Sequence, residues 1–303
     1  RIRPADMAKL DRADRRKGEL HARNWANLGA QVVGKGTVEE SGAQVSIRFE
    51  LYTPHNGRRV FARRYRGPAS GMRMIGHRIA DDIVEAILKE KGFFATRLLF
   101  VQGNYRAKNV WICDSDGHNA RALTHGDSLC IFPDWFPDGK RILFTSYFEG
   151  RPLMYEMTLS SGRTTRLLAL PGMNTSGAVS PDGTHLAAIL DKDGHPELYV
   201  ATLGGRRLRR LTRSRAVESS PTWSPDSGRL AYTSDASEGR PQIYVISREG
   251  GNPRRITSSG FSRYCTSPAW SPDGKKLAFV AKIGGNFEVC VHDFDSRQTD
   301  RKS

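Results

Sequence analysis

The sequence predicts a small α+β domain followed by an all-β propeller of short antiparallel strands. Three observations lead to this fold class. A turn motif built on Ser-Pro-Asp recurs in the later part of the 303-residue chain, two further markers keep nearly the same period, and the residues before about Lys91 do not follow it. A four-stranded unit that repeats every 40–45 residues or so is typical of propeller blades. We place the two domains at residues 1–95 and 96–303.

Three strands followed by a helix are predicted in the first domain. The expected strands are residues 30–40, 43–54 and 58–67, with turns at Glu40-Ser41-Gly42 and His55-Asn56-Gly57. Residues 71–92 have the periodicity of an amphipathic helix that ends at Gly92 as a C-cap. Its expected apolar stripe consists of Ile79, Ile83, Val84 and Ile87. We expect this domain to lack its own first strands.

The repeat is marked by a β-turn. Its four copies are Phe136-Pro137-Asp138-Gly139, Ser180-Pro181-Asp182-Gly183, Ser224-Pro225-Asp226-Ser227 and Ser271-Pro272-Asp273-Gly274. The aspartates Asp138, Asp182, Asp226 and Asp273 are 44, 44 and 47 residues apart. Proline presets φ for the second turn position, aspartate tolerates the third, and glycine suits the fourth. These aspartates are therefore predicted to be structural.

The other two markers complete a four-stranded unit. A short strand with Trp135, Val179, Trp223 or Trp270 precedes each turn, and an alternating strand follows it. A Gly-x-Pro turn (Gly150, Gly194, Gly239) leads to the third strand, and a basic outer strand ends at Thr124, Leu168, Thr212 or Thr257. A sandwich does not repeat three markers in phase, so a propeller is favoured.

The number of blades is expected to exceed what this sequence contains. Residues 96–124 have the last three strands of a blade but no Ser-Pro-Asp strand before them, and four fuller units follow, the last fading near Asp295. Because a ring must close to remove its sheet edges, we expect about one more blade and a closing strand beyond Ser303.

Composition excludes several classes of function. No segment approaches the roughly 20 apolar residues of a membrane-spanning helix. The net charge is +15, with clusters at Arg58–Arg66 and Arg206–Arg210, and we interpret it as a solvated basic face rather than a specific polyanion site. The four cysteines lack C-x-x-C spacing, so we expect buried free thiols and no zinc site.

No catalytic motif emerges. The nucleophile elbow G-x-S-x-G of the peptidases that carry propellers is absent, and the histidines give no H-x-x-x-H or H-E-x-x-H pattern. Asp114-Ser115-Asp116-Gly117 lacks the later acidic ligand of an EF-hand and is interpreted as a hairpin turn. We predict no enzyme activity, no catalytic residue, no metal and no cofactor.

Beyond the repeat, the chain resembles the TolB family. The resemblance rests on "NWANLGAQVVGKGTV" (24–38), "HRIADDIVEAILKEKGFFATRLLFV" (77–101) and the Ser-Pro-Asp-Gly blades that follow. It implies six blades, of which about five are present, and a first blade completed by the C-terminus. It also implies a periplasmic, non-catalytic adaptor of the Tol–Pal system that supports outer-membrane integrity and constriction at cell division.

The implied partners are the lipoprotein Pal and inner-membrane Tol components such as TolA, with association to the outer membrane through Pal and no nucleic acid. Pal binding in this family implies a role for the loops between one blade's outer strand and the next blade's inner strand, here 125–128, 171–176, 214–219 and 258–264. Exposed side chains on a rigid rim favour recognition. The residues we select there are Met173, Asn174, Glu218, Arg263 and Tyr264. Two alternatives stay open: the propeller of a serine peptidase, and a polyanion-binding propeller.

Overall fold

The structure is a computed structural model that describes residues 22–27, 29–204 and 207–302. The chain folds into two compact units. One contains residues up to Leu98 together with Cys113–Asn119, and the other contains Leu99–Ile112 and the chain from Ala120 onward. In the part of the chain described, no helix is long and apolar enough to cross a membrane.

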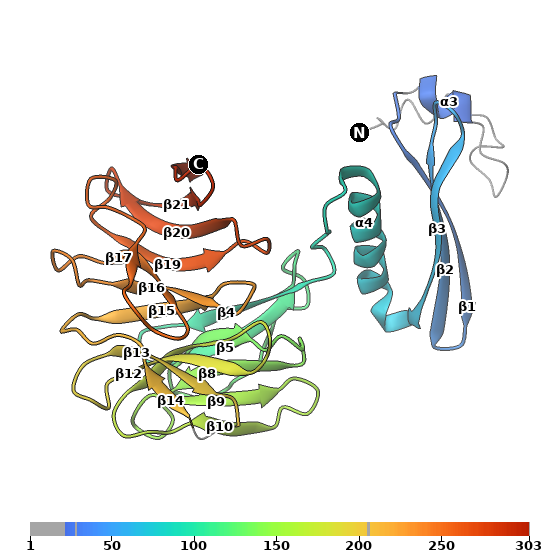
Figure 1. Ribbon diagram of the computed structural model, residues 1–303. Helices are drawn as coiled ribbons and strands as arrows, with labels where there is room; N and C mark the ends of the chain where they lie inside the picture. Colours follow the sequence, from blue (N-terminus) through green and yellow to red (C-terminus); the bar gives the residue numbers. More distant parts are fainter. Residues whose placement is uncertain (1–21, 28, 205–206, 303) are drawn as a thin grey trace. The chain divides into compact units, whose positions relative to one another are not determined.

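The first unit is a three-stranded antiparallel sheet with one long helix (Figure 1). Its elements are α3 (Ala22–Asn27), β1 (Val33–Ser41), β2 (Gln44–Thr53), β3 (Arg58–Pro68), η1 (Ala69–Gly71) and α4 (Met72–Leu88). Both predicted turns and all three strands are present. Asp82 of α4 accepts hydrogen bonds from Arg63 and Tyr65 of β3, which attaches the helix to the sheet.

Two details of the helix differ from the prediction. Ile75 is the buried residue of α4, whereas Ile87, near the end of the helix, is exposed. The C-cap is Lys89, which adopts the left-handed conformation with φ 60°, and not Gly92. Gly92 is needed for another reason: a Cβ there would lie 2.4 Å from Asp81 Oδ1, which accepts the amide of Phe94.

The second unit consists of five antiparallel sheets that follow one another along the chain. The incomplete first sheet has β4 (Arg97–Gly103), β5 (Lys108–Asp114) and β6 (Arg121–Ala122). Two complete sheets follow, made of β7 (Cys130–Trp135), β8 (Arg141–Ser146), β9 (Leu153–Thr158) and β10 (Thr164–Leu168), then β11 (Asn174–Val179), β12 (His185–Leu190), β13 (Glu197–Thr202) and β14 (Leu208–Arg210).

The last two sheets have the same order. They consist of β15 (Glu218–Trp223), β16 (Arg229–Ser234), β17 (Gln242–Ser247) and β18 (Arg254–Arg255), then β19 (Cys265–Trp270), β20 (Lys276–Ile283), β21 (Asn286–Asp293) and β22 (Thr299–Lys302). The expectation that the final unit fades near Asp295 is wrong, since β22 pairs with β21 and completes the sheet. In the described part of the chain, the first sheet has no inner strand before β4, as predicted.

The residues of each sequence marker form specific hydrogen bonds in the structure. The turn serine and aspartate bond to each other and to the following backbone, as when Asp182 Oδ1 accepts from Ser180 Oγ at 2.5 Å and from Thr184 N at 2.9 Å. The outer-strand threonines Thr124, Thr212 and Thr257 each accept a third-strand amide at 2.9 Å. The carbonyls of Pro152, Pro196 and Pro241 accept the first amide of the next sheet's inner strand at 3.1, 3.3 and 2.8 Å. The Gly-x-Pro marker therefore joins neighbouring sheets.

The core lies between successive sheets. Trp223 of β15 is buried and donates its indole N–H to the carbonyl of Ala178 on β11 at 2.9 Å. It belongs to a cluster with Leu198, Leu230 and Tyr232 that spans both sheets. All four cysteines are buried free thiols, as predicted, and Cys265 and Cys290 lie in one such cluster.

Candidate functional site

The antiparallel order gives the sheets two different ends. One end carries the Ser-Pro-Asp turns and the hairpins between third and fourth strands; we call it the turn face. The other carries the loops from each outer strand to the next inner strand and the hairpins between second and third strands; we call it the loop face. All five residues selected from the sequence lie in or beside loops of the loop face.

Asn174 is wholly buried and holds its own loop together. Its side chain exchanges hydrogen bonds with the backbone N–H and C=O of Leu170 at 2.9 and 2.8 Å and donates to the carbonyl of Gly172 at 3.0 Å. The expectation that this amide is exposed is wrong. A side chain with its polar atoms engaged in this way shapes the loop rather than offering groups to a partner.

Glu218 is also buried, at the start of β15. Ser214 Oγ donates to its Oε1 at 3.3 Å, whereas Oε2 has no hydrogen-bond partner among the described residues. Burial raises the pKa of this carboxyl to about 7, and the nearby Glu197 adds to the effect. Glu197 itself accepts the amide of Ser214 at 2.8 Å, so two buried glutamates anchor the loop before β15. The expected exposure of Glu218 is again wrong.

The other three selected residues are not fully buried. Met173 is half-buried, and its amide donates to Asp191 Oδ1 at 2.5 Å. Arg263 is exposed, and Tyr264 packs edge-on against Phe287 with ring centroids 5.8 Å apart. Arg263 and Tyr264 line a cavity of about 380 Å³ with the β20–β21 hairpin. These three side chains are accessible to a partner, and their binding role stays a prediction.

The sequence reasoning selected Met173 and Tyr264 but missed the apolar series to which they belong. The position just before each inner strand is occupied by an apolar or aromatic residue: Leu129, Met173, Val217 and Tyr264. The second-to-third-strand hairpins add aromatic rings, and the exposed fractions are 80% for Tyr105, 81% for Phe148 and 65% for Phe287. Aligning the repeats on their turns would have revealed the first series. An apolar rim of this kind is typical of protein-binding surfaces.

The inner strands meet around a cavity of about 250 Å³. Each strand has a bulge where one non-glycine residue takes a left-handed conformation, at Phe132, Ser176, Ser220 and Ser267, with φ between 49° and 55°. Asp134 lies in this lining and accepts the amide of Val179 from the next sheet at 3.2 Å. Burial raises its pKa to about 6. The other repeats have Ala178, Thr222 and Ala269 there.

One group in the first unit has the composition of a metal site. Atoms of His77, Asp114 and Asp116 lie within 4.8 Å of one another. Arg73 donates to Asp116 Oδ2 at 2.5 Å, so a cation already neutralises that carboxylate. Gly117 N bonds to the carbonyl of Asp114 at 2.8 Å, which makes the segment the hairpin turn that was predicted.

Comparison with known proteins identifies the family. The profile described as TolB beta propeller domain (PD40) matches residues 84–302. The chain belongs to the TolB family. A Tol-Pal system protein TolB of Hahella chejuensis is 37% identical over 181 residues, which are 58% of this chain and 42% of that protein. One of Cereibacter sphaeroides is 36% identical over 157 residues, 50% of this chain and 35% of that protein. The matched region thus spans less than half the length of these TolB relatives.

A solved structure extends the likeness to nearly all of this chain. The crystal structure of TolB from Acinetobacter baumannii has a TM-score of 0.84 at 26% identity and covers 99% of this chain and 79% of that one. The predicted fold class, an α+β domain followed by propeller blades, is confirmed by this match and by the sheets described above. The six-blade count of a complete TolB propeller stays a prediction for this protein.

Proposed function

We propose that the protein is a non-catalytic periplasmic adaptor of the Tol–Pal system. In this role it binds Pal, acts with inner-membrane Tol components such as TolA, and supports outer-membrane integrity and constriction at division. Two relatives that are 36–37% identical are named Tol-Pal system proteins. That similarity is the observation that carries the proposal.

The loop face is the surface we propose for Pal. It presents exposed aromatic rings on short hairpins, and its loops are held by buried polar groups such as Asn174 and Glu197. A rigid rim with apolar anchors needs little ordering when a partner binds, which favours affinity. We therefore propose Met173, Val217, Arg263 and Tyr264 as contact residues and assign Asn174 and Glu218 to supporting the loops.

The test is a calorimetric titration of the full-length protein with the periplasmic domain of Pal from its own genome. We expect saturable binding that weakens at least tenfold in Tyr264→Ala, because interface aromatics are often worth about 2 kcal/mol. Leu208→Ser is the matched control, since Leu208 is as exposed as Tyr264 (37% against 38%) but lies on an outer strand. Absence of binding by the folded protein, or equal weakening in both variants, would contradict the proposal.

A further inference from the structure

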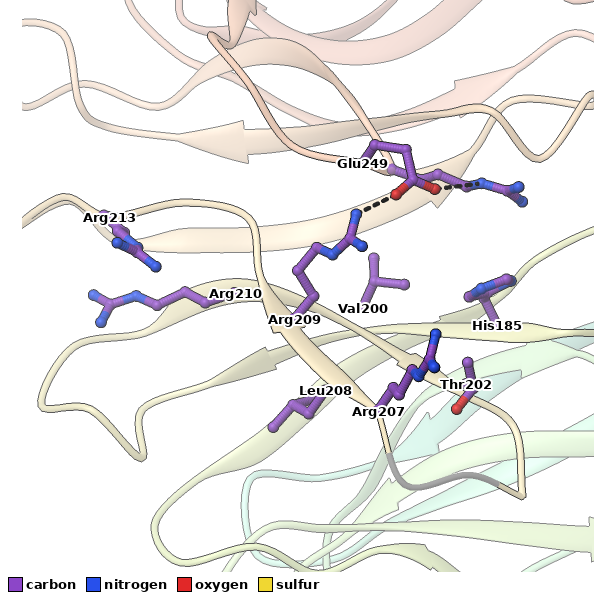
Figure 2. A pocket seen from close by; sticks show the side chains of 10 residues that line it. His185, Val200, Thr202, Arg207, Leu208, Arg209, Arg210, Arg213 and Glu249 are labelled. Carbon is purple, nitrogen blue, oxygen red and sulfur yellow. Dashed lines mark hydrogen bonds and ion pairs between the residues drawn. The ribbon is translucent and has the colours of Figure 1, made fainter.

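A cavity of about 720 Å³ lies along the outer strands of the β11–β14 sheet, from Arg207 before β14 to Arg213 in the loop after it (Figure 2). Five of its ten lining residues are arginines: Arg207, Arg209, Arg210, Arg213 and Arg248. Among the described residues of the lining, Glu249 is the single acidic one. We call this cavity the arginine cleft.

The backbone register explains why these side chains meet. Val200 pairs with Arg209 across β13 and β14, and His185 pairs with Thr202 across β12 and β13. Directly opposite residues point to the same side of a sheet. Arg207 follows in the same row as Thr202, whose amide bonds to the Arg207 carbonyl at 3.1 Å. The hairpin of the next sheet, with Arg248 and Glu249, closes the other side.

Acidic side chains engage three of the five arginines. Arg209 bonds to Glu249, Arg210 bonds to Glu197 at 2.8 Å, and Arg248 lies 3.3 Å from Glu249 and 3.5 Å from Asp182. Arg207 and Arg213 make no side-chain hydrogen bond or ion pair with any described residue. Arg207 precedes β14 and Arg213 follows it, and Figure 2 shows Arg209 between them.

The preceding repeat lacks this arrangement. Arg207 has an equivalent in Arg163, one period earlier, but Arg209 corresponds to Thr165 and Arg213 corresponds to Ala169. Val200 corresponds to Glu156, whose carboxylate pairs with Arg141 at 3.1 Å. Arg210 does have an equivalent in Arg166, so the cleft adds Arg209 and Arg213 to a basic outer strand that the repeats share.

We propose that the arginine cleft binds a phosphorylated polyanion with at least two phosphate groups. Guanidinium groups match phosphate oxygens in bidentate geometry. The volume suits a ligand of nucleotide size, since pockets for small molecules are about 300–1,000 Å³. Two guanidiniums at opposite ends, which the described residues leave unpaired, favour a ligand that carries anionic groups at both ends. The ligand could be a phosphorylated lipid headgroup or a free polyphosphate, which share this chemistry.

Glu249 competes with such a ligand for Arg209 and Arg248. Its removal would release Arg209 to the cleft and leave Arg248 with Asp182 as its acidic neighbour. The proposal thus predicts opposite effects from two substitutions: loss of Arg207 and Arg213 weakens anion binding, and loss of Glu249 strengthens it. A merely basic surface would also respond to charge, so each variant needs a charge-matched control outside the cleft.

The experiment is a calorimetric titration of the full-length protein with inorganic tripolyphosphate at low ionic strength. We expect Arg207→Gln combined with Arg213→Gln to weaken binding at least tenfold and Glu249→Gln to strengthen it severalfold. The control for the double variant is Arg121→Gln combined with Arg163→Gln, the repeat equivalent of Arg207, and the control for Glu249→Gln is Glu238→Gln; both are expected to change affinity less than twofold. All these side chains are exposed, so thermal melting should change little.

Two further arms identify the source of the phosphates. Flotation with phosphatidylcholine vesicles, with and without phosphatidylglycerol, shows whether a lipid headgroup occupies the cleft: capture that needs the anionic lipid and both arginines supports that source. Tripolyphosphate binding without vesicle capture supports a free ligand. Unchanged affinity in the Arg207→Gln and Arg213→Gln double variant, or equal loss in the charge-matched double control, would overturn the proposal. The proposal would also be overturned if single-stranded RNA bound through both arginines and tripolyphosphate did not bind.

Discussion

The loop face and the turn face are built by the same repeat but differ in how far the repeats agree. On the turn face, four copies of one turn use the same aspartate bonds, and even Ser227 takes the left-handed conformation (φ 58°) that glycine has elsewhere. On the loop face, the first inner-strand residue changes from Cys130 to Asn174, Glu218 and Cys265. The uniform end maintains the scaffold, and the variable end is free to specialise.

In the variable loops, burial determines whether a residue supports the loop or is accessible to a partner. Asn174 and Glu218 lie in variable loops, yet each is buried and supports its loop from within. Their immediate neighbours Met173 and Val217 are more accessible. The repeats therefore differ on the loop face in two ways: in the residues exposed at the surface and in the buried residues whose bonds shape the loops.

The largest loss of stability is expected when a side chain that packs two sheets together is removed, because both faces depend on that packing. Trp223→Ala should lower the free energy of unfolding by about 3–5 kcal/mol, because it removes a buried indole that joins two sheets. Trp270→Ala should cost about 2 kcal/mol, since Trp270 is half-buried, stacks on Phe294 of its own sheet and contacts Arg229 of the preceding sheet, but its indole N–H has no hydrogen-bond partner among the described residues. Urea unfolding of both variants checks this order, and equal losses would contradict the inter-sheet role of Trp223.

A pH-dependent effect is expected on the loop face. The pKa of Glu218 is about 7 in the folded protein against an ordinary 4.5, so folding favours the protonated acid. Its contribution to stability is full below about pH 4.5 and is lost as the pH rises through 7. Relative to Glu218→Gln, the wild type should lose about 3 kcal/mol between pH 4.5 and 8. Parallel stability curves for the two proteins would show that Glu218 is not responsible.

Substitutions of two adjacent residues, Asn174 and Met173, should distinguish support of the loop from binding of Pal. Asn174→Ala should lower stability by about 2 kcal/mol, because three internal hydrogen bonds are lost and backbone groups are left unpaired. Met173→Ser should change stability by less than about 0.5 kcal/mol but weaken Pal binding. Thermal melting and the Pal titration, run on both variants, distinguish the roles. A stability loss in Met173→Ser matching that of Asn174→Ala would remove the distinction.

The smallest effect is expected on the turn face. Ser180→Ala should cost about 1 kcal/mol, since Ser180 Oγ donates to Asp182 and accepts the amide of His185 at 2.9 Å. The turn itself should persist, because the equivalent turn has Phe136 in place of serine and still bonds Asp138 to the amides of Lys140 and Arg141. Pal affinity should stay unchanged in this variant. A change in affinity would mean that the two faces are coupled.

Much of the fold was predictable because the repeated residues form bonds with neighbours that are close in sequence. Ser-Pro-Asp turns, strand alternation and the three strands with their helix all depend on contacts between residues close in sequence, and the structure has them where the sequence placed them. The helix end was misplaced because Gly92 is required by contact with Asp81, eleven residues earlier. Asp134 was missed because its environment is created by four strands distant in sequence.

The repeat, the strand order within each blade and the family were predictable from the residues alone, since periodic spacing and turn chemistry are local properties. Which loop residues face outward depends on how the folded segments pack. Asn174 and Arg263 look alike as polar loop residues, but one is enclosed by its own loop and the other is exposed. The arginine cleft has the same origin: Arg207 and Arg248 are 41 residues apart in sequence, and only the packing of adjacent sheets places them in one cavity.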